Sequence, residues 1–195
     1  MKRKISSYYE TLRRLTQSVA ITDKRVRSLD LQSGFEQAIR LIAACLKRGG
    51  KLIFIGNGAS ASISSHMAVD FWKHAGIKAT AFNDPALLTC MSNDYGYEHV
   101  FSKPIKMFAD RGDLLIAISS SGASANILRA SQEARKKGVK VITLTGFSER
   151  NPLRKSGDIN FYIPADQYSH VEIMHHSICH YLLDIVIDAR GMSKK

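Results

Sequence analysis

Two continuous apolar runs along the chain are each followed by the same small, polar turn. The runs span residues 52–55 and 114–118, and each leads through small polar residues into Gly-Ala-Ser-Ala, at 58–61 and at 122–125. An uninterrupted apolar run is typical of a strand buried on both faces, as in a parallel sheet. Glycine allows a tight turn, and serine favours the start of a helix. We therefore predict two buried strands, each followed by a turn that opens a helix.

The rest of the pattern predicts strands that alternate with helices. Apolar residues recur at helical spacing over 4–27 and 31–48. We expect five strands, at 51–56, 78–82, 114–119, 139–144 and 160–163. Further helices are expected at 60–74, 86–92, 98–109, 125–137 and 168–190, with a polar and aromatic loop at 92–97. This order predicts an α/β fold, a three-layer sandwich with a parallel five-stranded sheet flanked by helices. A single domain over 1–195 is expected, with N-terminal helices for oligomerisation over 1–48 and an α/β core over 49–190.

The composition predicts a basic protein of the cytoplasm. The formal net charge is +11, and much of the excess lies in the first fifty residues. We interpret this charge as a solvated helix face, because no aromatic platform for nucleic acid accompanies it. No stretch is apolar over the length of a membrane span, and the basic N-terminus lacks the apolar core of a signal peptide. The three cysteines form no CxxC pair and are predicted to be buried free thiols: Cys45, Cys90 and Cys179.

Serine residues gather at the predicted carboxyl ends of the first and third strands, where ligands bind in open α/β sheets. Together with two helix N-termini, such hydroxyls favour a phosphate or a polyhydroxyl sugar. Each turn alone is also compatible with an ordinary capped strand-to-helix connection. The polar residues concerned are Asn57, Ser60, Ser119, Ser120, Ser121 and Ser124.

The first turn has a competing interpretation. Residues 56–61 fit the dinucleotide fingerprint G-x-G-x-x-A, and Asp84 follows the second strand as a ribose-binding acid would. That reading leaves the second serine turn unexplained, so an oxidoreductase is the least favoured class.

Histidine and carboxylate residues recur at intervals of four on two predicted helices. His66 and Asp70 form one such pair, and Glu172, His176 and His180 form a row on the last helix. This spacing puts the side chains on one helix face, where they can chelate zinc or hold a proton-transfer pair. A phosphate site beside a carboxylate and an imidazole suits proton transfer next to a carbonyl, as an aldose–ketose isomerase requires.

These motifs together resemble the sugar isomerase (SIS) domain family, and within it the bacterial phosphoheptose isomerases. The resemblance covers most of the chain and is carried by residues 56–60, 66–70, 92–96, 118–126, 141–146 and 172–175, with His180. It implies a homotetramer with active sites at subunit boundaries. It also implies conversion of sedoheptulose 7-phosphate to D-glycero-D-manno-heptose 7-phosphate through an enediol(ate), in heptose biosynthesis for lipopolysaccharide or capsule.

The resemblance further implies a role for each site residue. Substrate oxygens would be bound by Asn57, Gly58, Ser60, Asp94, Ser119, Ser120, Ser121 and Ser124. The implied zinc ligands are His66, Asp70, Glu172 and His180, and the implied acid/base pair is Asp70 and His180. The family usually has Glu in place of Asp70 and Gln in place of Glu172, so Glu172 is a second candidate for the base.

A non-catalytic function is the alternative from a different class. Some relatives of this fold bind sugar phosphates, or the bacterial replication initiator, without turning a substrate over. The presence of both His66 and His180 favours the enzyme, because a scaffold has no need of them.

Overall fold

A seven-stranded sheet forms the centre of the molecule, in the order β2-β1-β7-β6-β5-β3-β4. This computed structural model describes residues 2–192; Met1 and residues 193–195 of the predicted domain lie outside that range. Five adjacent strands are parallel: β3 (Leu52–Ile55), β4 (Ala79–Ala81), β5 (Leu114–Ser119), β6 (Lys140–Thr145) and β7 (Ile159–Tyr162). They correspond to the five predicted strands and confirm the α/β class.

The two remaining strands make the sheet mixed. The helix predicted over 4–27 ends early, because α1 spans Lys2–Ser18 and is followed by β1 (Ala20–Asp23) and β2 (Ser28–Leu29). β1 runs antiparallel to β7, with Ile21 opposite Phe161. Ile21 is buried in this pairing. If α1 continued outward as a helix, the Ile21 side chain would be exposed. Residues 20–23 therefore pair at the edge of the sheet although their apolar spacing is helical, and the helix predicted over 19–27 was wrong.

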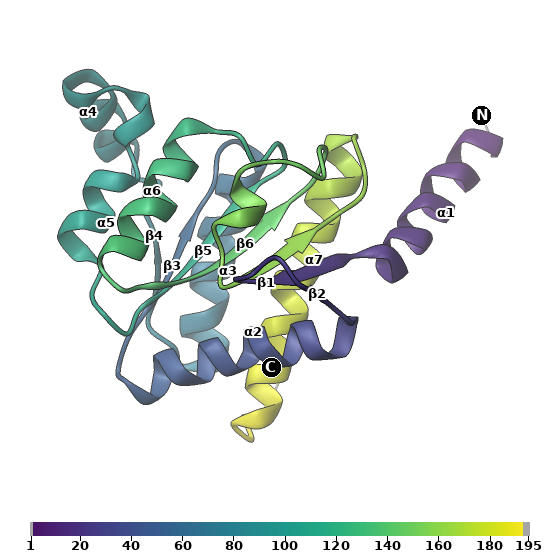
Figure 1. Cartoon of the computed structure of the whole chain (residues 1–195), viewed down its shortest axis with the longest axis horizontal. Helices are drawn as coiled ribbons and strands as arrows, with labels where there is room; N and C mark the ends of the chain where they lie inside the picture. The colour runs from purple at the N-terminus through teal and green to yellow at the C-terminus, as the bar shows by residue number, and fades with distance from the viewer. Residues whose placement is uncertain (1, 193–195) are drawn as a thin grey trace.

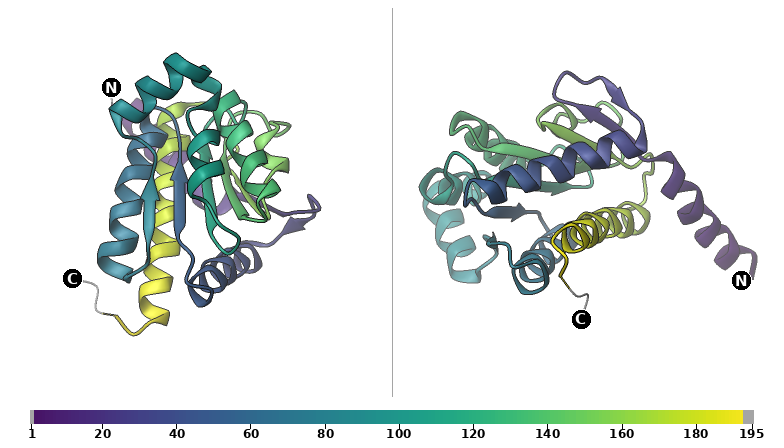
Figure 2. Two further views of the ribbon diagram at one scale, coloured as in Figure 1. Left: turned by 90° about the vertical axis from the view of Figure 1, so that its left-hand side faces the viewer. Right: turned by 90° about the horizontal axis from the view of Figure 1, so that it is seen from below.

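Helices cover both faces of the sheet (Figures 1 and 2). On one face lie α2 (Leu31–Lys47), α3 (Ala59–Ala75) and α7 (Tyr168–Ala189), and α3 and α7 run side by side. On the other face lie α5 (Ser102–Phe108) and α6 (Ala125–Lys136). Along β3, Leu52 and Phe54 pack into the hydrophobic core beneath α2, α3 and α7, while Ile53 and Ile55 pack into the core beneath α5 and α6. Burial of alternate residues on both sides explains why this strand is apolar throughout.

The segment after β4 is more helical than predicted. α4 spans Pro85–Tyr95, so residues 92–95 of the predicted loop are helical, and only Gly96 ends the helix. Asp84 caps this helix by accepting from Leu87 N, and proline occupies its first turn, which are both favourable helix starts. Short 3₁₀ helices complete the chain, η1 over Tyr97–His99 and η2 over Leu153–Lys155.

Two of the three thiols are buried as predicted. Burial raises the pKa of Cys45 to about 11 and that of Cys179 to about 12. Cys90 is exposed on α4, so the prediction for this residue was wrong. Between residues 2 and 192, none of the helices combines the length and the apolar character that crossing a membrane requires.

Candidate active site

A small pocket lies where β3 and β5 end, and we call it the serine pocket. It has a volume of about 120 Å³ and is lined by Asn57, Ser60, Ser119, Ser120, Ser121, Ser124, Tyr168 and Glu172. The two turns with the shared Gly-Ala-Ser-Ala sequence therefore meet, because β3 and β5 are neighbours in the sheet. Six of the eight residues predicted to bind substrate come together here.

The serine pocket presents hydrogen-bonding groups that the fold leaves available. The Ser120 hydroxyl is buried and has no hydrogen-bond partner, which is uncommon for a buried polar atom. Ser124, the N-cap residue of α6, makes no side-chain cap hydrogen bond, and Gly58, the N-cap residue of α3, has no side chain to make one. By contrast, aspartates cap α2 and α4, whose N-termini lie elsewhere. The first N–H groups of a helix carry partial positive charge, so this arrangement suits an anion.

An asparagine pair fixes the two turns relative to each other. Asn57 Nδ2 donates to Asn126 Oδ1 at 3.0 Å, and Asn126 Nδ2 donates back to Asn57 Oδ1 at 2.9 Å. The Tyr97 hydroxyl donates to the same Asn57 oxygen at 3.0 Å. Asn57 lines the serine pocket, but these bonds make its amide a structural link between the turns. Asn126 was not among the predicted site residues.

The approach of α3 to the end of β3 requires glycine at one position. A Cβ on Gly56 would lie 2.5 Å from the backbone carbonyl of Ser60. Main chain atoms cannot move aside as a flexible side chain can, so a larger residue here would displace the turn. This close approach positions Ser60 at the pocket wall.

A row of half-buried polar residues continues from the serine pocket along α7. Glu172, His176 and His180 are spaced by four and share one face of the helix. The facing helix α3 contributes His66 and Asp70. The His66 ring lies 5.3 Å from the His176 ring and 5.7 Å from the His180 ring, measured between centroids.

The three histidines form a possible metal-binding group. One ligand nitrogen from each of His66, His176 and His180 lies within 4.8 Å of the others, and no second group of this kind occurs in the described part of the chain. Nε2 of His176 is buried without a hydrogen-bond partner. Burial lowers the pKa of His176, and the nearby His180 and His66 lower it further. The neutral imidazole that results is the form that binds a metal.

Both Asp70 oxygens face histidines of the same helix. Oδ2 lies 3.1 Å from His66 Nε2, and Oδ1 lies 3.8 Å from His74 Nε2. The predicted His66–Asp70 pair is therefore present. Glu172, by contrast, lies in the wall of the serine pocket.

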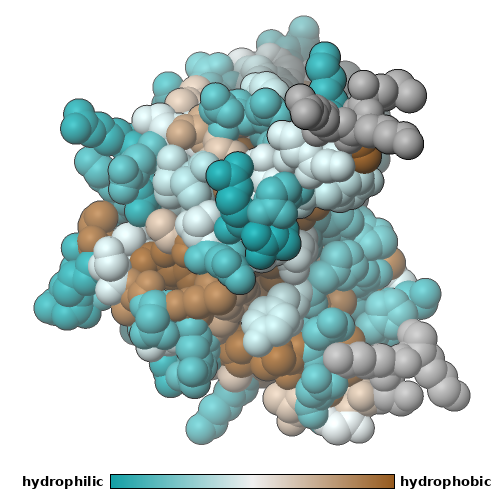
Figure 3. Space-filling model, turned by 90° about the vertical axis from the view of Figure 1, so that its right-hand side faces the viewer, coloured by the Kyte–Doolittle hydropathy of each residue, from teal (hydrophilic) through white to brown (hydrophobic). Residues whose placement is uncertain are grey.

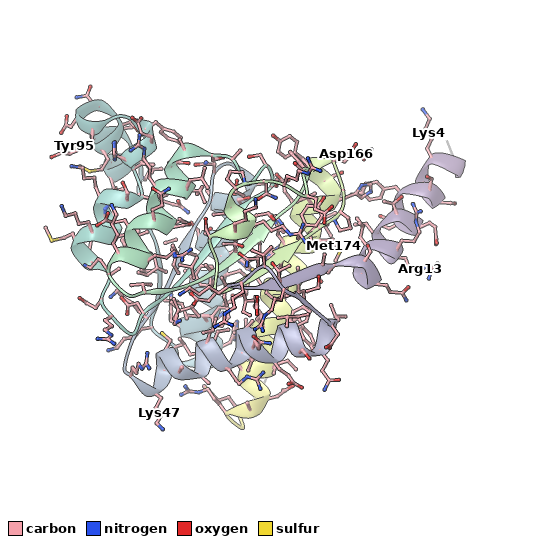
Figure 4. The ribbon with its side chains drawn as sticks, viewed as in Figure 1. Lys4, Arg13, Lys47, Tyr95, Asp166 and Met174 are labelled. Atoms are coloured by element: carbon pink, nitrogen blue, oxygen red, sulfur yellow. The ribbon has the colours of Figure 1, made fainter. Side chains whose placement is uncertain are left out.

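Two predicted binding residues are not part of the serine pocket. Asp94 is exposed near the end of α4, where it accepts from Asn93 Nδ2 at 2.9 Å. Its neighbour Tyr95 is well separated from Asp166, which precedes α7 (Figure 4). Gly58 adopts a positive φ of 55° at the start of α3 and does not line the pocket.

Two residues that contribute to the site were missed as site residues in the sequence. Tyr168 lines the serine pocket from the first turn of α7, and its ring meets Phe147 at a centroid distance of 4.8 Å. His176 joins the histidine group although it was not assigned as a ligand. Its place between Glu172 and His180, in a row with a spacing of four residues, was a signal that could have included it.

Comparisons with known proteins agree with this architecture. A sequence model of the SIS domain matches residues 8–146. The phosphoheptose isomerase of Sodalis glossinidius is 39% identical over 157 residues, which cover 77% of this chain and 80% of the relative. That of Rhodospirillum rubrum is 35% identical over 170 residues, with coverage of 84% and 90%.

Solved structures show the same similarity over nearly the whole chain. A phosphoheptose isomerase from Francisella tularensis superposes with a TM-score of 0.83 at 30% identity, covering 97% of this chain and 98% of that one. The enzyme from Neisseria gonorrhoeae gives 0.81 at 28% identity, covering 95% and 98%. The chain therefore belongs to the SIS domain family. Its similar relatives within that family are phosphoheptose isomerases, which confirms the resemblance stated from the motifs.

Proposed function

We propose that this chain is an aldose–ketose isomerase that converts sedoheptulose 7-phosphate to D-glycero-D-manno-heptose 7-phosphate through an enediol(ate). The observation that carries the proposal is the serine pocket, with its available Ser120 hydroxyl, at one end of the Glu172–His176–His180 row. The relatives named phosphoheptose isomerase support the same reaction. The substrate is thus a small sugar phosphate.

The serine pocket would hold the phosphate group. Neutral hydroxyls and backbone N–H groups at two helix N-termini can donate to phosphate oxygens without a lysine or arginine in the pocket wall. The net charge of +11 would attract a dianionic substrate over longer range. In a heptulose 7-phosphate the carbonyl lies far from the phosphate, so the sugar would extend from the pocket along α7.

The acid/base groups would come from the facing helices α3 and α7. Asp70, Glu172 and His180 are the candidates. The contacts favour Glu172 as the carboxylate that meets the substrate, because it lines the serine pocket while both Asp70 oxygens face histidines. An imidazole such as His180 would then transfer the proton of the substrate oxygen, since histidine is the side chain most often used as a general acid or base.

Zinc is the proposed cofactor. The residues present fit it, since three imidazoles approach one another and His176 Nε2 lacks any other partner. When bound there, zinc would polarise the substrate carbonyl. The resemblance implied a different ligand set, His66, Asp70, Glu172 and His180, which shares only His66 and His180 with this group.

We also propose a homotetramer that functions in the cytoplasm. A groove of about 840 Å³ lies between the end of α1, α2 and α7, with Phe35, Ile39 and Ile178 among its apolar residues. Figure 3 shows the hydrophobic surface on this side of the molecule. α1 projects from the body and exposes Ile5 and Tyr9 (Figure 1). Contacts between copies would cover these side chains.

The proposal is tested by incubating the protein with sedoheptulose 7-phosphate in D₂O and following the sugar by NMR. We expect new aldose anomeric signals, with deuterium at the carbon that exchanges its proton. Glu172→Gln should lose most of this conversion, whereas His99→Ala, changed on η1 outside the serine pocket and the histidine group, should retain it. Binding of the sugar phosphate without turnover would favour the regulatory alternative. A protein that neither binds nor converts the sugar phosphate would refute the proposal.

A further inference from the structure

The row on α7 contains a carboxylate, Glu172, and two imidazoles, His176 and His180. Only the imidazoles approach His66 of α3 closely. We infer that His66, His176 and His180 are the protein ligands of the metal ion, and that Asp70 and Glu172 lie outside its ligand set. This inference rests on the proposed zinc site, but it does not depend on the identity of the sugar.

The histidine geometry supports a shared ion. His176 and His180 are one turn apart on α7, with ring centroids 4.5 Å apart, and His66 approaches both from α3. Their ligand nitrogens lie within 4.8 Å of one another, a spacing that side-chain rotation can close onto a single ion. Neither the Asp70 nor the Glu172 carboxylate joins all three imidazoles at that spacing.

His176 has a ring nitrogen for which a metal ion would be a partner. Its Nε2 atom is buried and unpaired, although buried polar atoms are nearly always hydrogen-bonded. A metal ion would satisfy this nitrogen. Three imidazoles would also supply the three protein ligands that catalytic zinc sites typically have.

Asp70 acts on this group through His66. With Nε2 of His66 at 3.1 Å from Asp70 Oδ2, the ring nitrogen left for a metal is Nδ1. A carboxylate that binds the second nitrogen of a ligating histidine fixes the ring orientation and raises its basicity. Asp70 is thus a positioning residue in this arrangement.

Glu172 is released from the metal by the same arrangement. It lies one turn before His176 and lines the serine pocket with Ser120 and Tyr168. A carboxylate bound to an ion is a weaker base than a free one. The third histidine therefore allows the glutamate at this position to face the substrate as a base.

The test measures metal binding by the full chain without any sugar. Zinc affinity is obtained by competition with a coloured chelator, and the cobalt(II) form is followed by its visible absorption. We expect His176→Ala to weaken zinc binding by more than the roughly 10–100-fold that loss of an outer-shell partner costs, and Asp70→Asn to fall within that range. Glu172→Ala and the control His99→Ala should bind zinc and give the cobalt spectrum of the wild type.

Zinc binding that survives His176→Ala, or is lost equally in Glu172→Ala, would overturn the inference. If His176→Ala fails to fold, long-range ¹⁵N NMR of the wild-type chain decides: zinc should shift ring nitrogens of His66, His176 and His180, and an unchanged His176 would refute its role. A chain that binds zinc through His176 but does not convert the heptose phosphate would support this inference and refute the proposed function. The two failures are therefore distinguishable.

Discussion

The Asn57–Asn126 pair provides a quantitative test of how the serine pocket is held together. The two amides exchange reciprocal hydrogen bonds across 69 residues of sequence, between the turn after β3 and the first turn of α6. We predict that Asn57→Ala and Asn126→Ala each destabilise the protein and that their effects are not additive. Each change breaks the same two bonds, so the double variant should lose less stability than the sum of the two single losses.

The structure gives the expected magnitude. Two shared bonds at about 0.5–1.5 kcal/mol each give a coupling energy of about 1–3 kcal/mol. Asn126 is 2% exposed, so its amide cannot turn to water when Asn57 is truncated. The loss for Asn57→Ala should therefore exceed that of the bonds alone and reach about 2–4 kcal/mol, because unsatisfied buried groups add a desolvation cost. Tyr97→Phe, which removes only the hydroxyl donor to Asn57, should cost about 0.5–1.5 kcal/mol.

The assay is equilibrium unfolding in urea for both single variants and the double variant. Protein concentration is fixed, because self-association shifts apparent stability. The Michaelis constant for the heptose phosphate is measured in parallel, and we expect it to rise as the two turns lose their relative position. Stability losses that add to within about 0.5 kcal/mol would refute the coupling, since independent sites behave in that way.

Three further predictions concern binding, assembly and thiol chemistry. Ser121→Ala and Ser124→Ala should each raise the Michaelis constant, because each loses a hydrogen bond to a charged phosphate that is worth about 1.5–3 kcal/mol of binding free energy. Unchanged constants in both variants would refute the assignment of the phosphate to this turn. Light scattering should give a mass near that of a tetramer of the 21.7 kDa chain, and a monomer at micromolar concentration would contradict the proposed assembly. Native protein should react with a thiol reagent at one cysteine, Cys90, whose pKa the neighbouring Asp94 charge raises. Asp94→Asn should lower that pKa and so speed the reaction several-fold at neutral pH, and an unchanged rate would argue against the interaction.

Local pattern was sufficient for most of the fold. The runs at 52–55 and 114–118 are apolar because both faces of a central parallel strand are covered, so their strand character is encoded in consecutive residues. The glycine and serine positions after each run likewise specify a turn and a helix start. For the same reason the positions of Ser60 and Ser119–Ser124 at the ends of strands could be predicted without knowing the neighbours.

Edges of the sheet and contacts between distant segments required the tertiary structure. Ile21 pairs with Phe161 far along the chain, and that burial ends a helical pattern that is locally plausible. Asp94 lies in the last turn of α4, which extends to Tyr95, and it does not line the serine pocket. Local spacing cannot reveal either outcome, because each depends on which surface another segment covers.

In the candidate site, too, some features follow from local spacing and others from the packing of distant elements. Spacing by four placed Glu172, His176 and His180 on one helix face, because the period of the helix is a local property. Which of them meets His66 is decided by how α3 packs against α7 over the sheet. The sequence by itself thus determined that imidazoles and carboxylates share helix faces. Only the packing of the two helices brought three imidazoles together and left Glu172 in the serine pocket, because the distance between side chains on different elements is set by the core beneath them.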